Sequence, residues 1–94
     1  MKELQEEFIG RGQVKGFAFT QIEKSAGYYI YEVKTETSKY YEVFKRMENT
    51  RFGCVSYPTN NAFGTWAWTY LDLSKAKDKG EELELLLEIK IGLI

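Results

Sequence analysis

The sequence contains no histidine, and it contains cysteine and proline only once each. Without histidine, these residues cannot form a His-ligated zinc site or a Ser-His or Cys-His catalytic arrangement. A scaffold held by intrachain disulfides is also excluded, because Cys54 has no second cysteine to pair with. We interpret Cys54 as a small structural side chain, since no histidine is present to activate it. We therefore predict no catalytic residue, no metal site and no cofactor.

Long apolar runs are missing as well. No segment approaches the roughly 20 apolar residues that a membrane-spanning helix needs. The N-terminus, which reads M-K-E-L-Q-E-E-F, lacks the apolar core of a signal peptide. These absences favour a soluble cytoplasmic protein without a membrane partner.

Neither sign of charge dominates the chain. Lys and Arg number 13 against 14 Asp and Glu, which gives a formal net charge of −1 at pH 7. Such a chain has no overall field that attracts nucleic acid. The charge is uneven, however, because residues 8–71 are mildly basic and the two ends are mildly acidic.

Aromatic residues are abundant and make up 16% of the chain. A chain of 94 residues forms one domain with a small core, which cannot easily bury every ring. We expect part of the aromatic surface to meet a partner.

The most strand-like stretch is 63–71, which reads F-G-T-W-A-W-T-Y-L. Its β-branched, aromatic and uncharged residues are typical of a central strand. Side chains alternate along a strand, so Trp66, Trp68 and Tyr70 share one face. The opposite face carries smaller groups, and we expect a helix to pack there, over Ala67, Thr69 and Leu71.

Four further strands are expected before this one. Residues 14–23 and 28–35 form a plausible antiparallel hairpin, with Phe17 and Phe19 on one side of the first strand and Tyr29, Tyr31 and Val33 on one side of the second. Residues 40–48 fit either a strand or a helix, and the short preceding turn favours the strand. Residues 52–57 form a short strand that Pro58 ends.

An amphipathic helix follows Asp72 and Ser74, either of which can cap its start. The stripe at spacings of three and four consists of Leu73, Ala76, Gly80, Leu83 and Leu87. Gly80 either allows close approach of the helix to the sheet or caps the helix C-terminus. The apolar residues of 85–94 continue the helix or form a last strand, and they need cover from this chain or from another copy.

The predicted fold class is α+β, with a meander-like antiparallel sheet of four or five strands covered on one face by a C-terminal helix. We predict a single domain over 1–94: an N-terminal arm at 1–12, the sheet at 13–71, and the helix with its apolar tail at 72–94.

The strongest candidates for a binding site are rings on one sheet face with cations nearby. Such rings can stack single-stranded bases, but a core or a subunit contact is the favoured interpretation. Glu32 and Glu42 lie on neighbouring predicted strands, as an acid–base pair requires. Lys34 and Lys45 lie nearby in the sequence, so a solvated charged face is the favoured interpretation. The candidate binding residues are Trp66, Trp68, Tyr70, Phe17, Phe19, Tyr29, Tyr31, Lys34, Arg46 and Arg51.

These features favour a non-enzymatic binding or assembly module that forms a homo-oligomer, or binds a protein partner, through the aromatic face or the apolar tail. The alternative is a protein that binds single-stranded nucleic acid by stacking. A third hypothesis, an enzyme using carboxylates, Tyr or Lys, would require a deep pocket with convergent Glu and Tyr side chains.

Overall fold

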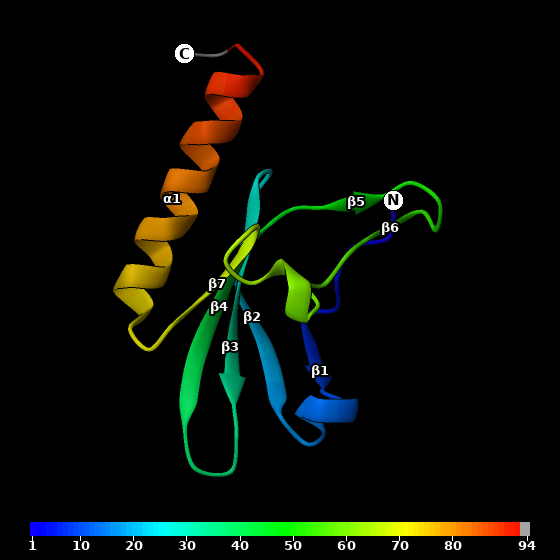
Figure 1. The fold of residues 1–94 in the computed structure, drawn as a ribbon, viewed down its shortest axis with the longest axis vertical. Helices are drawn as coiled ribbons and strands as arrows, with labels where there is room; N and C mark the ends of the chain where they lie inside the picture. The colour runs from blue at the N-terminus through cyan, green and yellow to red at the C-terminus, as the bar shows by residue number, and fades with distance from the viewer. Residues whose placement is uncertain (93–94) are drawn as a thin grey trace.

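The computed structural model describes residues 1–92 and places one helix against one five-stranded sheet (Figure 1). The sheet order is β1-β2-β3-β4-β7, and every neighbouring pair is antiparallel. The α+β prediction is therefore confirmed. The strands of the sheet are β1 (Glu7–Ile9), β2 (Ala18–Lys24), β3 (Tyr28–Lys34), β4 (Lys39–Lys45) and β7 (Ala67–Tyr70), and the helix is α1 (Leu73–Lys90).

The remaining elements are short and lie between β1 and β2 or between β4 and β7. A 3₁₀ turn, η1, spans Gly12–Val14, and a second, η2, spans Asn60–Ala62. A two-residue pair, β5 (Glu48–Asn49) with β6 (Cys54–Val55), forms its own small ladder. The strand predicted at 52–57 is therefore shorter than expected, whereas the strand interpretation of 40–48 is confirmed over Lys39–Lys45.

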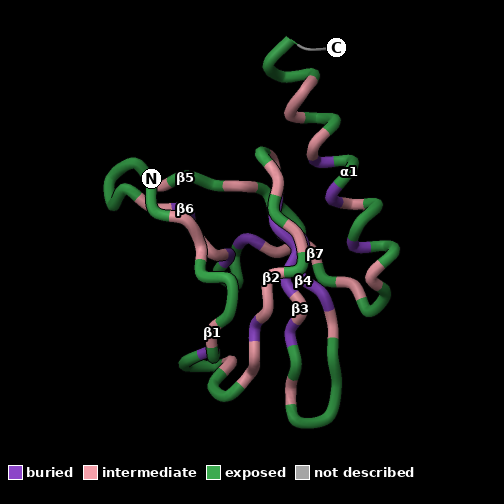
Figure 2. Tube along the Cα trace, turned by 180° about the vertical axis from the view of Figure 1, so that it is seen from behind, coloured by how far each residue is buried: buried purple, intermediate pink, exposed green. Residues whose placement is uncertain are grey.

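Two cores lie on opposite faces of the sheet. The helix-side core consists of Tyr28, Ile30, Tyr41 and Val43 from the sheet with Ala76 and Leu83 from α1. The ring-side core consists of Phe19, Tyr29, Tyr31, Val33, Phe44, Val55, Ala62 and Ala67. Figure 2 shows buried positions concentrated in the middle of the strands and on one side of α1. The predicted alternation along β3 is confirmed, because Tyr28 and Tyr29 lie in different cores.

The predicted orientation of β7 is wrong. Trp68 and Tyr70 pack in the helix-side core, whereas Ala67 is fully buried on the ring side and Leu71 is 83% exposed. Trp66 precedes the strand and packs on the ring side with Ala67. The error came from assuming that the sheet supplies small residues to the contact. Instead the helix supplies them, at Ala76 and Gly80, and the sheet supplies the rings.

Gly80 lies inside α1 and allows the helix to approach the sheet closely. A Cβ at this position would lie 2.5 Å from Cε2 of Tyr28. The helix continues for ten residues beyond Gly80, so the alternative of a C-terminal cap is wrong. Asp72 caps the start, because its Oδ1 accepts a hydrogen bond from the Ser74 amide at 2.8 Å.

The N-terminal arm predicted at 1–12 contains strand β1, which pairs with β2 at the sheet edge. Glu3 anchors the segment before it. The carboxylate of Glu3 accepts two hydrogen bonds from Arg46, at 2.5 and 2.7 Å, and one from the Tyr29 hydroxyl at 2.6 Å. These contacts fold residues 1–6 back over the ring-side core.

The C-terminal half of α1 extends beyond the sheet (Figure 1). The alternative of a last strand at 87–91 is wrong, since the helix runs to Lys90. Between 48% and 60% of Leu85, Leu86, Ile89 and Ile91 is exposed. Leu93 and Ile94, the last residues of the predicted tail, lie outside the described residues.

Candidate functional site

The predicted aromatic platform is not an exposed surface. Phe19, Tyr29 and Tyr31 are buried in the ring-side core, with Phe17 and Trp66 half-buried beside them. Trp68 and Tyr70 lie across the sheet under α1. The rings were expected on one sheet face, as a core, a subunit contact or a stacking platform. The N-terminal segment and the segment between β4 and β7 cover the ring side of the sheet, so Phe19, Tyr29 and Tyr31 are core residues.

The three predicted cations are dispersed. Lys34 forms an ion pair with Glu32 at 3.6 Å, and Arg46 is held by Glu3. Arg51 lies beside the exposed ring of Phe52, 5.4 Å from its centroid. Arg46 also donates a hydrogen bond of 2.8 Å to the hydroxyl of Tyr29, one of the predicted rings. Within residues 1–92 the three cations nevertheless lie at separate sites and form no common basic surface.

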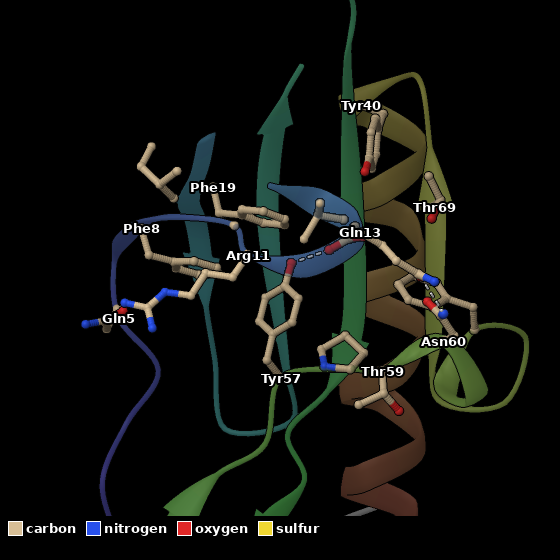
Figure 3. Close-up of a pocket in the computed structure, with 16 residues that line it drawn as sticks. Gln5, Phe8, Arg11, Gln13, Phe19, Tyr40, Tyr57, Thr59, Asn60 and Thr69 are labelled. Carbon is tan, nitrogen blue, oxygen red and sulfur yellow. Dashed lines mark hydrogen bonds between the residues drawn. The ribbon is translucent and has the colours of Figure 1, made fainter. Parts of the chain in front are cut away.

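The N-terminal segment and the segment between β4 and β7, which together form the ring-side cover, leave an open cavity of about 1080 Å³. Figure 3 shows the residues that line it, which come from β1, the η1 turn, β2, β4, β7 and the segment that contains Tyr57 and η2. Its apolar wall includes the stacked rings of Phe8 and Phe19, whose centroids are 4.6 Å apart. Tyr57 meets both rings edge-on, at 5.4 and 5.6 Å.

Glu42 lies on the wall that the sheet provides. It occupies the centre of β4, opposite Tyr31 on one side and Thr69 on the other, and it is only 8% exposed. Its Oε1 accepts a hydrogen bond from the Tyr57 hydroxyl. Burial raises the pKa of Glu42, and the hydrogen bond from Tyr57 opposes that rise. Burial and the adjacent carboxyl raise the pKa of Tyr57 well above its usual range, so Tyr57 remains a neutral donor.

Polar side chains line the rest of the cavity. The Asn60 amide donates a hydrogen bond of 3.0 Å to Oε1 of Gln13, joining η2 to the η1 turn (Figure 3). Gln5, Tyr40 and Thr69 add further donors and acceptors. Arg11 and Glu42 are the two charged residues of the described lining. The Arg11 guanidinium extends past Phe8 toward Gln5, away from the Tyr57 hydroxyl (Figure 3).

The prediction that Glu42 lies on a solvated charged face is wrong, because Glu42 is buried and lines the cavity. The register places it opposite Tyr31 and places Glu32 opposite Tyr41, so the two carboxylates face opposite sides of the sheet and form no pair. Glu32 is neutralised by Lys34, as predicted, but Glu42 is buried with Tyr57. The available signal was the alternation Tyr40, Glu42, Phe44, which places a carboxyl between two inward-facing rings. The approach of Tyr57 had no signal, because it depends on the path of an irregular segment.

The described residues give no indication of a metal or a membrane span. No group of three or more Cys, Asp or Glu side chains within 1–92 could hold a metal ion. In the same range, no helix is long and apolar enough to cross a membrane.

Comparisons with known protein families, with curated proteins and with solved structures find no match for this chain.

Proposed function

We propose that this protein is a binding module that holds a small organic molecule in the ring-side cavity. The observation that carries the proposal is the Glu42–Tyr57 pair, a buried polar contact on the wall of a cavity that is otherwise lined by apolar side chains, neutral polar groups and Arg11. Small-molecule sites are concave and mostly apolar, with a few polar groups that fix orientation. The cavity volume exceeds that of a drug-sized ligand, so a ligand need not fill it.

The proposal is tested by filling the cavity from its edge. Thr69 lines the cavity but is exposed on an edge strand, so Thr69→Trp adds bulk without disturbing a core. Thr65→Trp is the matched control, because Thr65 is exposed and does not line the cavity. Two-dimensional amide NMR with indole, phenol, benzamide and benzamidine should shift the lining amides of the wild type and of Thr65→Trp, and barely those of Thr69→Trp. No shift in the wild type with any of the four probes would reject the proposal.

The cavity also favours an enzymatic alternative, since a Glu and a Tyr do converge in it. A carboxyl with a raised pKa is suited to act as a general base near neutral pH. Tyr57 is a poor general acid for donating a proton in the same reaction, because its pKa is raised still further from neutrality. Binding needs only the contacts described, so it is the simpler proposal. Proton NMR of an amine and amide mixture incubated with the protein would reveal turnover, which Glu42→Gln should abolish if Glu42 is the base.

A second candidate function, self-association, is favoured by the C-terminal half of α1. Leu85, Leu86 and Ile89 are about half exposed, so this half of α1 presents apolar side chains to solvent beyond those that Leu83 and Leu87 turn toward the rest of the molecule. A contiguous exposed apolar patch of this kind is typical of a protein-binding surface. We propose a second copy of this chain as the occupant, packed antiparallel. The first half of α1 (73–81) carries Lys75, Lys77 and Lys79 against Asp78 and Glu81, and the second half (82–90) carries Glu82, Glu84 and Glu88 against Lys90. An antiparallel overlap of whole helices therefore brings a net positive half against a net negative half.

Light scattering at about 100 µM tests this surface, a concentration that populates even a micromolar dimer. The wild type should be a dimer, and the double variant Leu85→Glu with Ile89→Glu should be a monomer. Leu71→Glu is the matched control, because Leu71 is equally apolar and more exposed but lies outside α1. A monomeric wild type would contradict the proposal, as would a Leu71 variant that dissociates as readily as the double variant.

Base stacking has less support from the structure than these two candidates. It requires accessible rings, and three of the seven predicted rings are buried. Titration with a single-stranded oligonucleotide, followed by tryptophan fluorescence, checks it directly: salt-sensitive quenching would support stacking, and an unchanged signal would oppose it.

A further inference from the structure

We propose that the cavity selects a cation, specifically an amine or amidine on a flat apolar body, and that the N–H groups of this ligand pair with Glu42. The inference rests on the proposed function, because it names the class of molecule that the cavity holds.

The first observation is that Glu42 has no cationic partner. No Lys or Arg nitrogen among residues 1–92 lies within 4.0 Å of its carboxylate. The side chains opposite it on β3 and β7, Tyr31 and Thr69, are neutral. Arg11, the cation of the lining, extends in another direction (Figure 3). A buried carboxylate is normally paired with a cation or a metal ion, and burial without one raises the pKa of Glu42. A bound cation would remove the cost of ionising this carboxyl.

The second observation concerns the two oxygens of Glu42. Oε1 accepts the hydrogen bond from Tyr57, whereas Oε2 accepts none from the described residues. Oε2 is nevertheless not fully enclosed, since the fully buried side-chain oxygen without a partner in this range belongs to Glu23. Oε2 therefore remains accessible, on a residue that lines the cavity. A charged N–H donor bound there would form a short, charge-assisted hydrogen bond in a poorly solvated site.

The third observation is the apolar, largely aromatic wall of the cavity. Phe8, Phe19 and Phe63 line the cavity with Val14 and Pro58. Flat rings pack favourably against such walls, and the faces of Phe and Tyr rings attract cations. The aromatic wall and Glu42 thus favour the same ligand: an apolar ring that carries a positive charge.

The experiment compares three probes of nearly equal shape. Benzamidine is a cation, benzamide is its neutral counterpart and benzoate is its anionic counterpart. Calorimetric titration of the wild type near pH 7.5 should show benzamidine binding about tenfold or more tightly than benzamide, with benzoate the weakest. The Glu42→Gln variant should lose that preference and bind benzamidine and benzamide about equally. The control Glu32→Gln, which removes a carboxylate on the other face of the sheet, should retain it.

The outcomes separate this inference from the proposed function. If benzamide binds as tightly as benzamidine, the cavity is a binding site but the cation preference is wrong. Tighter binding of benzoate, abolished by Arg11→Gln, would overturn the inference in favour of an anion held by Arg11. If none of the three probes binds and the amide NMR test also fails, both proposals fall. The comparison of probes on the wild type decides the question even if Glu42→Gln unfolds.

Discussion

The two faces of the sheet are covered in different ways. On one face a single helix places Ala76, Gly80 and Leu83 against large side chains such as Tyr28. On the other, two short strands, β5 and β6, together with two 3₁₀ turns and irregular segments, cover a larger set of rings. The regular cover packs closely, and the irregular cover leaves a cavity containing a buried carboxyl.

The difference shows that the kind of element covering a sheet face determines whether that face is closely packed or leaves a cavity. A helix presents side chains at fixed intervals, so one glycine at the right position brings the whole helix close to the sheet. An irregular segment must satisfy its own backbone groups, and it brings polar side chains such as Asn60 and Tyr57 with it. Close packing stabilises the first face, and incomplete packing makes the second face available to a ligand.

The largest effect is expected where the close packing is broken. Gly80→Leu places a side chain into the ring of Tyr28, and we expect a loss of about 2–3 kcal/mol in the free energy of unfolding, measured with urea. Lys77→Leu is the matched control on an exposed position of α1, and it should change stability by less than about 0.5 kcal/mol. Equal stability of the two variants would mean that α1 does not approach the sheet this closely.

A smaller effect is expected on the ring side. Tyr57→Phe removes the donor to Glu42 and should cost about 1–2 kcal/mol at neutral pH, because it leaves a buried carboxylate oxygen without its partner. Tyr70→Phe, which removes a hydroxyl on the other face without a hydrogen bond among the described residues, should cost less. Urea unfolding of both variants makes the comparison, and equal losses would remove the special role of the Glu42–Tyr57 contact.

Glu42 should also make stability depend on pH. Its pKa in the folded protein is raised above the ordinary 4.5 by burial, so the folded state holds this proton more tightly than the unfolded state. The resulting stabilisation is fully present below about pH 4.5 and is lost as pH rises through the folded pKa. Relative to Glu42→Gln, the wild type should therefore lose stability between pH 4.5 and neutrality. A constant difference across this window would show that Glu42 titrates normally.

The smallest effect is expected at the N-terminal arm. Arg46→Met removes both hydrogen bonds to Glu3, and exchange of the β1 amides should accelerate by roughly fivefold while α1 amides keep their rates. Arg51→Met, which changes an exposed cation elsewhere, is the control.

Hydrogen bonds from Arg46 and Tyr29 hold the pKa of Glu3 well below its ordinary 4.5. The anchor is therefore complete above pH 4.5 and is lost as pH falls through the folded pKa. The protection of the β1 amides, taken relative to their intrinsic exchange rates, should therefore stay constant in the wild type between pH 7 and 5.

The sequence predicted the features that depend on local periodicity. The stripe through Ala76, Gly80 and Leu83 identified the buried side of α1, and alternation separated Tyr28 from Tyr29. It did not predict which face receives the helix. Alternation defines two faces without saying which partner each one meets, and the decision depended on the small residues of α1 packing against Trp68 and Tyr28.

The candidate site was predictable only in part. An inward-facing Glu42 follows from alternation with Tyr40 and Phe44, because these residues share one face of β4. The other side of the site depends on residues 46–66, whose course is set by contacts far apart in the chain, such as Met47 with Ser56 and Gln13 with Asn60. No local pattern contains that information.

The lengths of the edge strands affect how readily copies of this chain can pair through their sheets. The outermost strands, β1 and β7, have three and four residues, while the inner ones have seven. Short edge strands offer a neighbouring chain few unpaired amide and carbonyl groups, so the sheet is poorly suited to extension by strands of other copies. Short edge strands therefore limit edge-to-edge association of a chain that is rich in aromatic residues.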